Sequence, residues 1–314
     1  MKKVFCPEPD SFSEKGLQLA AEKFELTARP MSQEDFERLA PDFDAALIRF
    51  NTKIGPEVMK NGSNLKAILS PTTGLDHIDM RAAEQNGINV FHLKDQVAFL
   101  DTISATSELT IALMLAALRK IPHAFDDVKD GQWNVSAWRG REAAGRVLGI
   151  VGCGRLGSKV ARTAQALGMD VIALDPANIE LPNGVKKVDC LTTLLKESDI
   201  ISLHVHLSDE TRHMIGAEQF DLMKQGAVLI NTARGAIVNS SALLDALNLR
   251  KISAAAVDVL ENEHEINSKA HPLIDYAKAN ENLIITPHMG GATFEAVEKT
   301  DQFIINRYLQ SLKP

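Results

Sequence analysis

The N-terminal part of the chain alternates short apolar runs with longer stretches whose apolar positions recur at helical spacing. This alternation predicts strands and helices in turn, which is typical of a parallel sheet covered by helices on both faces. The predicted strands are Lys3–Cys6, Ala45–Arg49, Ala67–Ser70 and Asn89–Phe91. The predicted helices are Glu14–Lys23, Gln33–Leu39 and Asp79–Gln85.

A longer helix is predicted over Ser104–Ile121, and Pro122 is expected to mark its end. Its apolar side chains recur at i, i+3, i+4 and i+7, at Ile111, Met114, Leu115 and Leu118. A helix with one such apolar face is expected to pack in a core or to act as a strut between domains.

A second series of alternating elements begins at Arg146. Helices such as Leu156–Leu167 and Ser241–Leu249 separate its predicted strands, which are Val147–Val151, Val171–Leu174, Ile200–Leu203, Val228–Asn231, Ala254–Val257 and Leu283–Thr286. A last helix, Thr293–Leu312, is expected to pack on the first domain. The sequence therefore predicts an α/β chain of two Rossmann- or flavodoxin-like domains, each a doubly wound parallel sheet. The expected domains are residues 1–97 with 289–314, and residues 98–288.

Composition narrows the class of partner. The 314 residues carry a formal net charge of −7, which argues against binding to nucleic acid or to an anionic membrane surface. No apolar run approaches the roughly 18–20 residues of a membrane span, and the N-terminus lacks the apolar core of a signal peptide. The three cysteines, Cys6, Cys153 and Cys190, have no CxxC spacing. We therefore expect reduced thiols, a cytoplasmic protein and no bound metal.

The segment Gly152-Cys153-Gly154-Arg155-Leu156-Gly157 has the GxGxxG spacing of a dinucleotide-binding turn. It follows an apolar strand and opens a helix, which is the context that this motif requires. Gly152 would permit the tight turn, Gly154 would let the backbone approach the pyrophosphate, and Gly157 would let helix and strand pack closely. The start of the helix at Arg155 and Leu156 would offer backbone N–H groups to the pyrophosphate.

Asp175 ends the next predicted strand, 18 residues after Gly157. An acid at this position accepts hydrogen bonds from the adenosine ribose and repels a 2′-phosphate. Pro176 follows it, with no arginine to receive that phosphate. The sequence therefore predicts NAD as the cofactor, in preference to NADP.

Three later segments place reactive side chains just beyond predicted strands. Arg234 can bind a carboxylate through its planar guanidinium, His288 can transfer a proton, and Glu263 can modulate that histidine. Taken singly, each has a structural explanation as an ion pair, a capping residue or an exposed acid. Together, behind a dinucleotide turn, they form the set that reduction of a keto acid requires.

These segments resemble the D-isomer-specific 2-hydroxyacid dehydrogenase family over nearly the whole chain. The matching motifs are Thr73–Asp79, Gly152–Gly157, Ser202–Thr211, Asn231–Gly235, Asp258–Glu263 and Thr286–Gly291. The resemblance implies interconversion of a small 2-keto acid and a (D-)2-hydroxy acid by hydride transfer. It also implies an active-site cleft between a substrate-binding domain (1–97 and 289–314) and an NAD-binding domain (98–288).

The resemblance also implies roles for the candidate residues. His288 would be the general acid in reduction and the base in oxidation, and Glu263 would hydrogen-bond it and stabilise the imidazolium. Arg234 would bind the substrate carboxylate and polarise the carbonyl. Backbone N–H groups of Thr73 and Gly74 would hold the other carboxylate oxygens.

On the cofactor side, the resemblance implies that Asp258 contacts the nicotinamide carboxamide. Further cofactor contacts are expected from His204, Thr211, Thr232 and Gly290. A homodimer is also implied, with the predicted helix Ser104–Ile121 as a contributor. Thr72 stands where the family often has glycine, so the substrate side chain stays undetermined.

Other functions remain open at this point. A redox-sensing corepressor or scaffold could use the same fold and could keep Arg234, Glu263 and His288. A formate dehydrogenase is disfavoured, because that reaction donates no proton to a carbonyl and a different residue is expected at Glu263. Phosphoglycerate dehydrogenase remains possible, although a regulatory domain beyond Leu312 is not expected.

Overall fold

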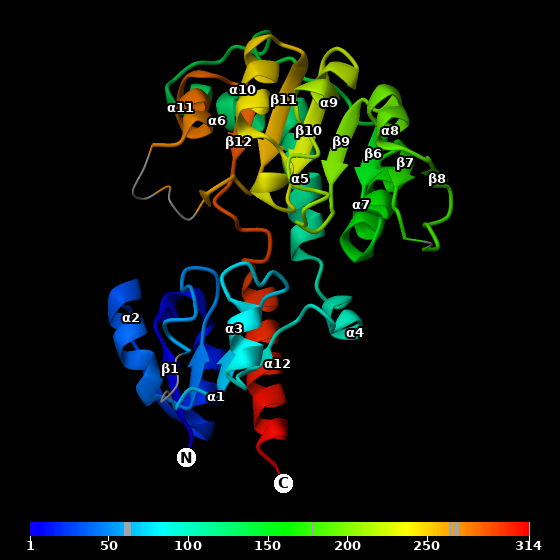
Figure 1. The fold of residues 1–314 in the computed structure, drawn as a ribbon. Coiled ribbons are helices and arrows are strands. Elements are labelled where there is room, and N and C mark those ends of the chain that lie inside the picture. The colour runs from blue at the N-terminus through cyan, green and yellow to red at the C-terminus, as the bar shows by residue number, and fades with distance from the viewer. Residues whose placement is uncertain (60–63, 178, 264–265, 267–269, 314) are drawn as a thin grey trace. The chain divides into compact units, whose positions relative to one another are not determined.

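The protein is described by a computed structural model that covers residues 1–59, 64–177, 179–263, 266 and 270–313. Contacts between Cα atoms divide the chain into two compact units (Figure 1). Unit 1 comprises Met1–Ile103 and Ala292–Pro314, and unit 2 comprises Ser104–Gly291. Each unit contains its own parallel sheet, as the sequence predicts.

The sheet of unit 1 has the strand order β2-β1-β3-β4-β5, and every pair is parallel. This is the order of a flavodoxin-like doubly wound sheet. The strands are β1 (Lys3–Cys6), β2 (Glu25–Ala28), β3 (Ala45–Leu47), β4 (Ala67–Leu69) and β5 (Asn89–Phe91).

Five α-helices accompany this sheet in the described part of unit 1. They are α1 (Glu14–Lys23), α2 (Gln33–Leu39), α3 (Met80–Gln85), α4 (Val97–Leu100) and α12 (Phe294–Ser311). Short 3-10 turns occupy Pro9–Ser11 and Ala40–Asp42. Helix α12 packs against α1, β4 and β5, so the C-terminal helix belongs to unit 1 (Figure 1). Thr293 caps it, because its side chain accepts a hydrogen bond from the Ala296 N–H.

Alternation along β1 shows why both faces of this sheet are covered. Val4 and Cys6 are buried in one apolar cluster, and Phe5 between them is buried in the other. Successive side chains of a strand point to opposite faces, so a strand that is apolar throughout needs a core on each side.

The sheet of unit 2 has the order β12-β11-β10-β9-β6-β7-β8, again with every pair parallel. The strands are β6 (Val147–Val151), β7 (Asp170–Leu174), β8 (Lys186–Lys187), β9 (Ile200–Leu203), β10 (Ala227–Asn231), β11 (Ile252–Val257) and β12 (Leu283–Ile285). Chain order reverses between β6 and β9. The carboxyl ends of these two strands are where a doubly wound sheet binds its dinucleotide.

Helices cover both faces of this sheet. Those in the described part of unit 2 are α5 (Ala105–Arg119), α6 (Ile121–Lys129), α7 (Arg155–Ala166), α8 (Leu191–Glu197), α9 (Ala217–Leu222), α10 (Ser240–Asn248) and α11 (Pro272–Ala279), with a 3-10 turn at Gly235–Ile237. Side chains of α5 and α7 share one core with Leu148 and Ile150. Side chains of α8, α9 and α10 share the other core with Val151.

The predicted helix Ser104–Ile121 is in fact followed by a second helix. Helix α5 ends at Arg119, Lys120 adopts a left-handed conformation (φ 54°), and α6 begins at Ile121. Pro122 therefore lies in the first turn of a new helix rather than beyond an old one. Proline is tolerated there because its missing N–H would have no partner within the helix.

The division between units differs by a few residues from the predicted one. On the N-terminal side, Phe99, Leu100 and Ile103 belong to the core of unit 1, so this unit continues past residue 97. On the C-terminal side, Asp258 accepts hydrogen bonds from the N–H groups of Met289 and Gly290, which keeps the turn around His288 in unit 2.

Candidate active site

The glycine turn lies at the carboxyl end of β6. Gly152 has a φ of +87°, and a Cβ there would lie 2.9 Å from the carbonyl group of His204. A Cβ on Gly157 would lie 2.2 Å from the Gly152 carbonyl oxygen, so only glycine lets α7 approach the turn this closely. A Cβ on Gly154, by contrast, would meet no heavy atom within 4 Å. The backbone therefore requires glycine at positions 152 and 157, and the approach of a pyrophosphate to Gly154 stays a prediction.

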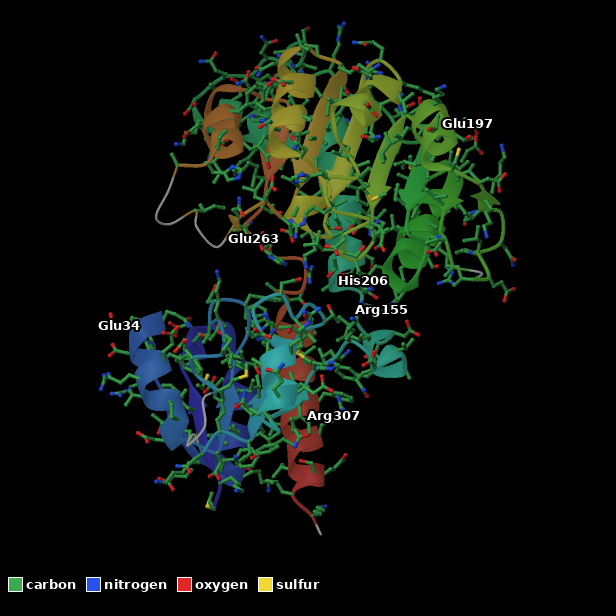
Figure 2. All side chains as sticks on the ribbon, viewed as in Figure 1. Glu34, Arg155, Glu197, His206, Glu263 and Arg307 are labelled. Carbon is green, nitrogen blue, oxygen red and sulfur yellow. The ribbon has the colours of Figure 1, made fainter. Side chains whose placement is uncertain are left out.

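Helix α7 begins directly at this turn, with Arg155 and Leu156 as its first residues (Figure 2). Among the described residues, no side chain caps its N-terminus. Its first N–H groups, together with the open space at Gly154, fit a pyrophosphate, because a helix N-terminus carries a partial positive charge.

Asp175 follows β7 and is bonded to the glycine turn. Its carboxylate accepts hydrogen bonds from the Cys153 N–H (2.8 Å) and the Ala177 N–H (2.9 Å). A carboxylate has about four acceptor sites, so two such bonds leave capacity for ribose hydroxyls. Asp175 therefore also stabilises the glycine turn, besides its predicted contact with the ribose.

The loop after β9 contains two predicted cofactor ligands. His204 Nε2 lies 2.8 Å from the Ser202 hydroxyl, and burial lowers the pKa of the His204 imidazole to about 4. The Thr211 hydroxyl donates to the His206 carbonyl (2.6 Å) and accepts from the Ser208 N–H (2.8 Å). Both side chains thus support the loop, and their contact with a cofactor stays a prediction.

Asn231, which is buried at the end of β10, shapes the segment that carries Arg234. Its side chain accepts from the Ala233 N–H and donates to the Arg234 carbonyl, both at 3.0 Å. The Arg234 guanidinium donates to the Ala233 carbonyl (2.7 Å), and the Thr232 hydroxyl lies 2.8 Å from that of Thr110. Asn231 has no predicted role of its own, although a polar residue at the end of an apolar strand indicates a turn that needs side-chain hydrogen bonds.

Asp258, at the end of β11, organises the turn that carries His288. Its buried carboxylate accepts hydrogen bonds from the Thr286 hydroxyl (2.5 Å) and from the N–H groups of Met289 (2.9 Å) and Gly290 (2.8 Å). Burial raises the pKa of Asp258, and these hydrogen bonds oppose that rise. Asp258 therefore already accepts three hydrogen bonds from its own chain. Its contact with a nicotinamide stays a prediction.

His288 and Glu263 form the hydrogen-bonded pair that the resemblance implies. His288 Nδ1 lies 2.5 Å from Glu263 Oε1, and Glu263 Oε2 accepts from the Leu260 N–H at 3.2 Å. Because a carboxylate only accepts, Nδ1 carries a hydrogen, and Nε2 is the ring atom that can gain or lose a proton. His288 has a φ of +53°, and its N–H donates to the Asp258 carbonyl (2.8 Å), so the surrounding turn holds a conformation that non-glycine residues rarely adopt.

Gly235 brings the loops after β10 and β11 into direct contact. A Cβ on Gly235 would lie 2.0 Å from the Leu260 carbonyl carbon and 2.3 Å from the Glu261 nitrogen. Only glycine permits this approach. The segment of Arg234 and the segment of Glu263 are therefore packed against each other, which the sequence analysis did not foresee.

Thr73 and Gly74 lie in unit 1, in the loop after β4. Thr72 donates its hydroxyl hydrogen to the Gly74 carbonyl (2.8 Å), and its hydroxyl lies 2.7 Å from that of Ser70. Ser70 in turn lies 3.3 Å from His77 Nε2. This network shapes the loop whose N–H groups are expected to bind a carboxylate. Thr72, an unusual residue by family resemblance, is thus a structural member of the loop.

Two features are absent from the described residues, namely a metal site and a membrane-spanning helix. These residues contain no group of histidine, cysteine and acidic side chains arranged to hold a metal ion. Among the described helices, none is long and apolar enough to cross a membrane.

The parallel sheet of unit 2, the glycine turn and the acid after β7 define a dinucleotide-binding domain. A model of the D-isomer specific 2-hydroxyacid dehydrogenase NAD binding domain matches residues 111–290. The chain belongs to this family and is an NAD-dependent dehydrogenase.

Individual relatives agree on the class and differ in substrate. A hydroxypyruvate reductase of Thermotoga maritima is 36% identical over 93% of this chain and 92% of its own length. A D-3-phosphoglycerate dehydrogenase of Methanocaldococcus jannaschii is 35% identical over 100% of this chain, which spans only 58% of that protein. The crystal structure of D-lactate dehydrogenase from Aquifex aeolicus complexed with NAD and lactic acid has a TM-score of 0.83 and 29% identity, covering 99% of this chain and 95% of that one.

Proposed function

We propose that the chain reduces a small 2-keto acid to its (D-)2-hydroxy acid and catalyses the reverse oxidation, with His288 as the general acid and base. The observation that carries this proposal is the hydrogen bond between His288 Nδ1 and Glu263, which keeps a hydrogen on Nδ1, so that Nε2 is the ring atom that gains and loses the proton. This hydrogen bond lies in the same unit as a turn that fits a dinucleotide.

Each proposed role follows from the chemistry of the side chain. The Arg234 guanidinium binds the substrate carboxylate and withdraws electron density from the adjacent carbonyl. The Thr73 and Gly74 N–H groups bind the remaining carboxylate oxygens. When bound, NADH supplies the hydride that reaches the keto carbon. His288 Nε2 donates a proton to the carbonyl oxygen, and Glu263 stabilises the imidazolium that precedes this transfer.

The cofactor site is proposed to prefer NAD over NADP. Gly152, Gly154, Gly157 and the start of α7 hold the pyrophosphate, and Asp175 receives the ribose hydroxyls. The Asp175 carboxylate repels a 2′-phosphate. We further assign cofactor contacts to the residues that the family resemblance implies, namely His204, Thr211, Thr232, Asp258 and Gly290.

A homodimer in the cytoplasm is part of the same proposal. The predicted contributor, α5, buries Leu113 and Met114 inside unit 2, so it offers less surface than expected. Helix α6 and the segment after it instead expose large apolar side chains, namely Ile121, Phe125, Val128, Trp133 and Val135. Exposed apolar patches mark interaction sites, and a second copy would bury this one. Sedimentation of the purified chain tests the dimer.

The proposed reaction is tested with a panel of 2-keto acids and NADH, followed at the nicotinamide absorbance. The panel contains glyoxylate, hydroxypyruvate, pyruvate and branched and aromatic keto acids. His288→Ala is expected to lower the rate on the best substrate by ~10²–10⁴-fold, the usual scale for a positioned general acid. NADH binding, measured by fluorescence titration, should change little. Equal rates in the variant and the wild type would contradict the role of His288, and no turnover of any acid would favour an NAD-binding regulatory protein.

A further inference from the structure

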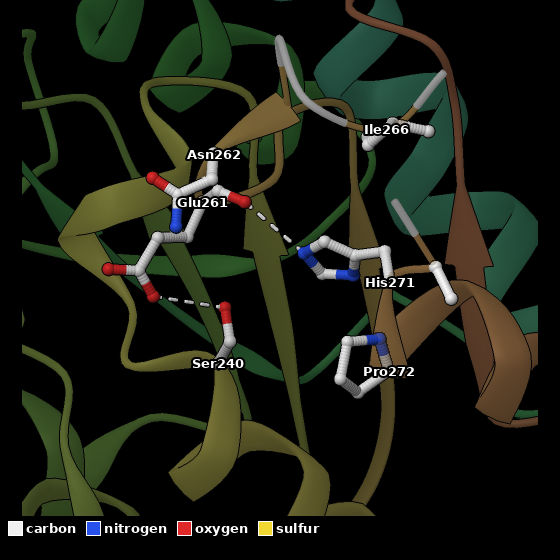
Figure 3. A pocket seen from close by; sticks show the side chains of 7 residues that line it. Ser240, Glu261, Asn262, Ile266, His271 and Pro272 are labelled. Atoms are coloured by element: carbon white, nitrogen blue, oxygen red, sulfur yellow. Dashed lines mark hydrogen bonds between the residues drawn. The ribbon is translucent and has the colours of Figure 1, made fainter. Parts of the chain in front are cut away.

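Glu261, two residues before Glu263, ties together the three loops that follow β9, β10 and β11. Its Oε1 lies 2.6 Å from Nε2 of His213, in the loop after β9. Its Oε2 accepts a hydrogen bond from the Ser240 hydroxyl (3.2 Å), at the start of α10 (Figure 3). A carboxylate cannot donate, so His213 Nε2 is the donor of the short bond.

The backbone of Glu261 is held as well. The Glu261 carbonyl accepts from His271 Nε2 (3.2 Å), as Figure 3 shows. His271 Nδ1 accepts from the Leu273 N–H (3.3 Å), which leaves the hydrogen on Nε2 and fixes the direction of the bond to Glu261. Gly235 presses against Leu260 and the Glu261 nitrogen from the other side. Side chain and backbone of Glu261 are therefore anchored at four points.

The position of Glu261 is transmitted to Glu263 over a very short stretch of chain. Asn262 between them has a left-handed backbone (φ 56°). The Leu260 N–H donates to Glu263 Oε2, which closes the turn on itself. A shift of Glu261 therefore moves the carboxylate that His288 Nδ1 contacts.

The turn is closely packed where Gly235 meets it, but the side that faces Ser240 and His271 is open. A hollow of about 220 Å³ adjoins it, lined by Ser240, Glu261, Asn262, Ile266, His271 and Pro272 among others (Figure 3). Because the hollow leaves space beside the turn, no neighbouring side chain packs closely enough there to hold the turn in place once the Glu261 carboxylate is removed.

We propose that Glu261 is a positioning residue, which holds Glu263 in place against His288 through its bonds to His213 and Ser240. The proposal rests on the proposed function of His288. Glu261 is therefore expected to affect the rate of proton transfer by His288 and not the affinity for NADH.

The test compares Glu261→Ala with Glu261→Gln, since the amide oxygen of glutamine can still accept a hydrogen bond. In Glu261→Ala, kcat for keto-acid reduction should fall by about tenfold. The pH dependence of reduction should change as well, while the KM for the keto acid changes little, because a displaced Glu263 no longer holds the hydrogen on His288 Nδ1. Glu261→Gln should recover most of the rate, and Glu218→Ala, which removes an exposed glutamate of α9, should match the wild type.

A purely structural role predicts a different pattern. Activity would then fall in proportion to folded protein and NADH binding, with the pH profile unmoved, and that result would overturn the proposal. Unchanged kcat and pH profile in Glu261→Ala would overturn it too. If Glu261→Ala does not fold, His213→Ala removes the short bond alone and should shift the pH profile in the same direction by a smaller amount; an unmoved profile in that variant would also count against the proposal.

Failure of the proposed function is distinguishable from failure of this inference. If the wild type reduces no keto acid, or if His288→Ala is fully active, the role of His288 is wrong. The positioning effect can still be measured without turnover, by following the ring of His288 with pH in ¹⁵N-histidine-labelled protein. The ¹⁵N signal of His288 Nδ1 should move in Glu261→Ala, and an unchanged signal would reject the coupling between Glu261 and the pair.

Discussion

Protonation of His204 should weaken the folded state of unit 2 in mildly acidic solution. His204 follows β9 beside Gly152, and its Nε2 lies 2.8 Å from the Ser202 hydroxyl. Burial lowers its pKa from 6.5 to about 4, because a charged imidazolium would lose its hydration there. The folded protein therefore resists a proton that the unfolded chain accepts.

The sign and size follow from this difference. Above pH 6.5 the imidazole is neutral in both states and contributes no pH dependence. Between pH 6.5 and about 4 only the unfolded chain binds the proton, so the free energy of unfolding falls by about 1.4 kcal/mol per pH unit. At pH 5 the loss from this one residue is about 2 kcal/mol, and it levels off below pH 4.

Urea unfolding at pH 8 and pH 5 measures this loss. The wild type should lose about 2 kcal/mol more between the two pH values than His204→Asn does, since all other titrating groups are common to both. His206→Asn, which removes the exposed histidine two residues further on, controls for the loss of a histidine from this loop. Equal losses in the wild type and His204→Asn would refute the reasoning.

Two further predictions concern the cofactor site. Gly157→Ala should lower the free energy of unfolding by about 1–3 kcal/mol, because the new methyl group would lie 2.2 Å from the Gly152 carbonyl oxygen. Gly154→Ala should leave stability nearly unchanged yet weaken NADH binding, because its methyl group would lie in open space where the pyrophosphate is expected. Thermal unfolding and fluorescence titration with NADH check this contrast between the two variants. Equal NADH affinity in Gly154→Ala and the wild type would contradict it. Asp175→Asn keeps an oxygen for the Cys153 N–H and removes the negative charge. The ratio of kcat/KM for NADH to that for NADPH should therefore fall by roughly tenfold, which corresponds to the loss of about 1.4 kcal/mol of repulsion between the carboxylate and the 2′-phosphate. An unchanged ratio would exclude charge repulsion by Asp175 as the source of selectivity.

Most strands were predictable from local pattern, including the edge strands β5 and β12, but the edge strands β2 and β8 were not. Strands β1, β6 and β9 read as apolar runs because both of their faces are buried. Strands β2 (Glu25–Ala28) and β8 (Lys186–Lys187) lie at sheet edges and carry exposed or charged residues. They are strands because they pair with the preceding strand, β1 or β7, and the apolar pattern of their own few residues does not reveal that pairing.

The same division applies to the candidate site. The sequence by itself determined the glycine turn, because strand, turn and helix are adjacent along the chain and each glycine acts on its own backbone. It also predicted Arg234, Glu263 and His288 as the reactive side chains. Family resemblance already predicted the hydrogen bond between Glu263 and His288, and the structure contains it. Only the tertiary structure decided that Asp258 accepts three hydrogen bonds from the turn that carries His288.

The contacts of Glu261 show most clearly what the sequence could not supply. Glu261 and Glu263 stand in one acidic stretch and look alike in sequence. In the folded protein Glu261 forms hydrogen bonds with His213 and Ser240, whereas Glu263 forms one with His288. The physical reason is that these partners follow different strands, and the order in which β9, β10, β11 and β12 lie side by side is set by burial of both sheet faces and not by any local spacing.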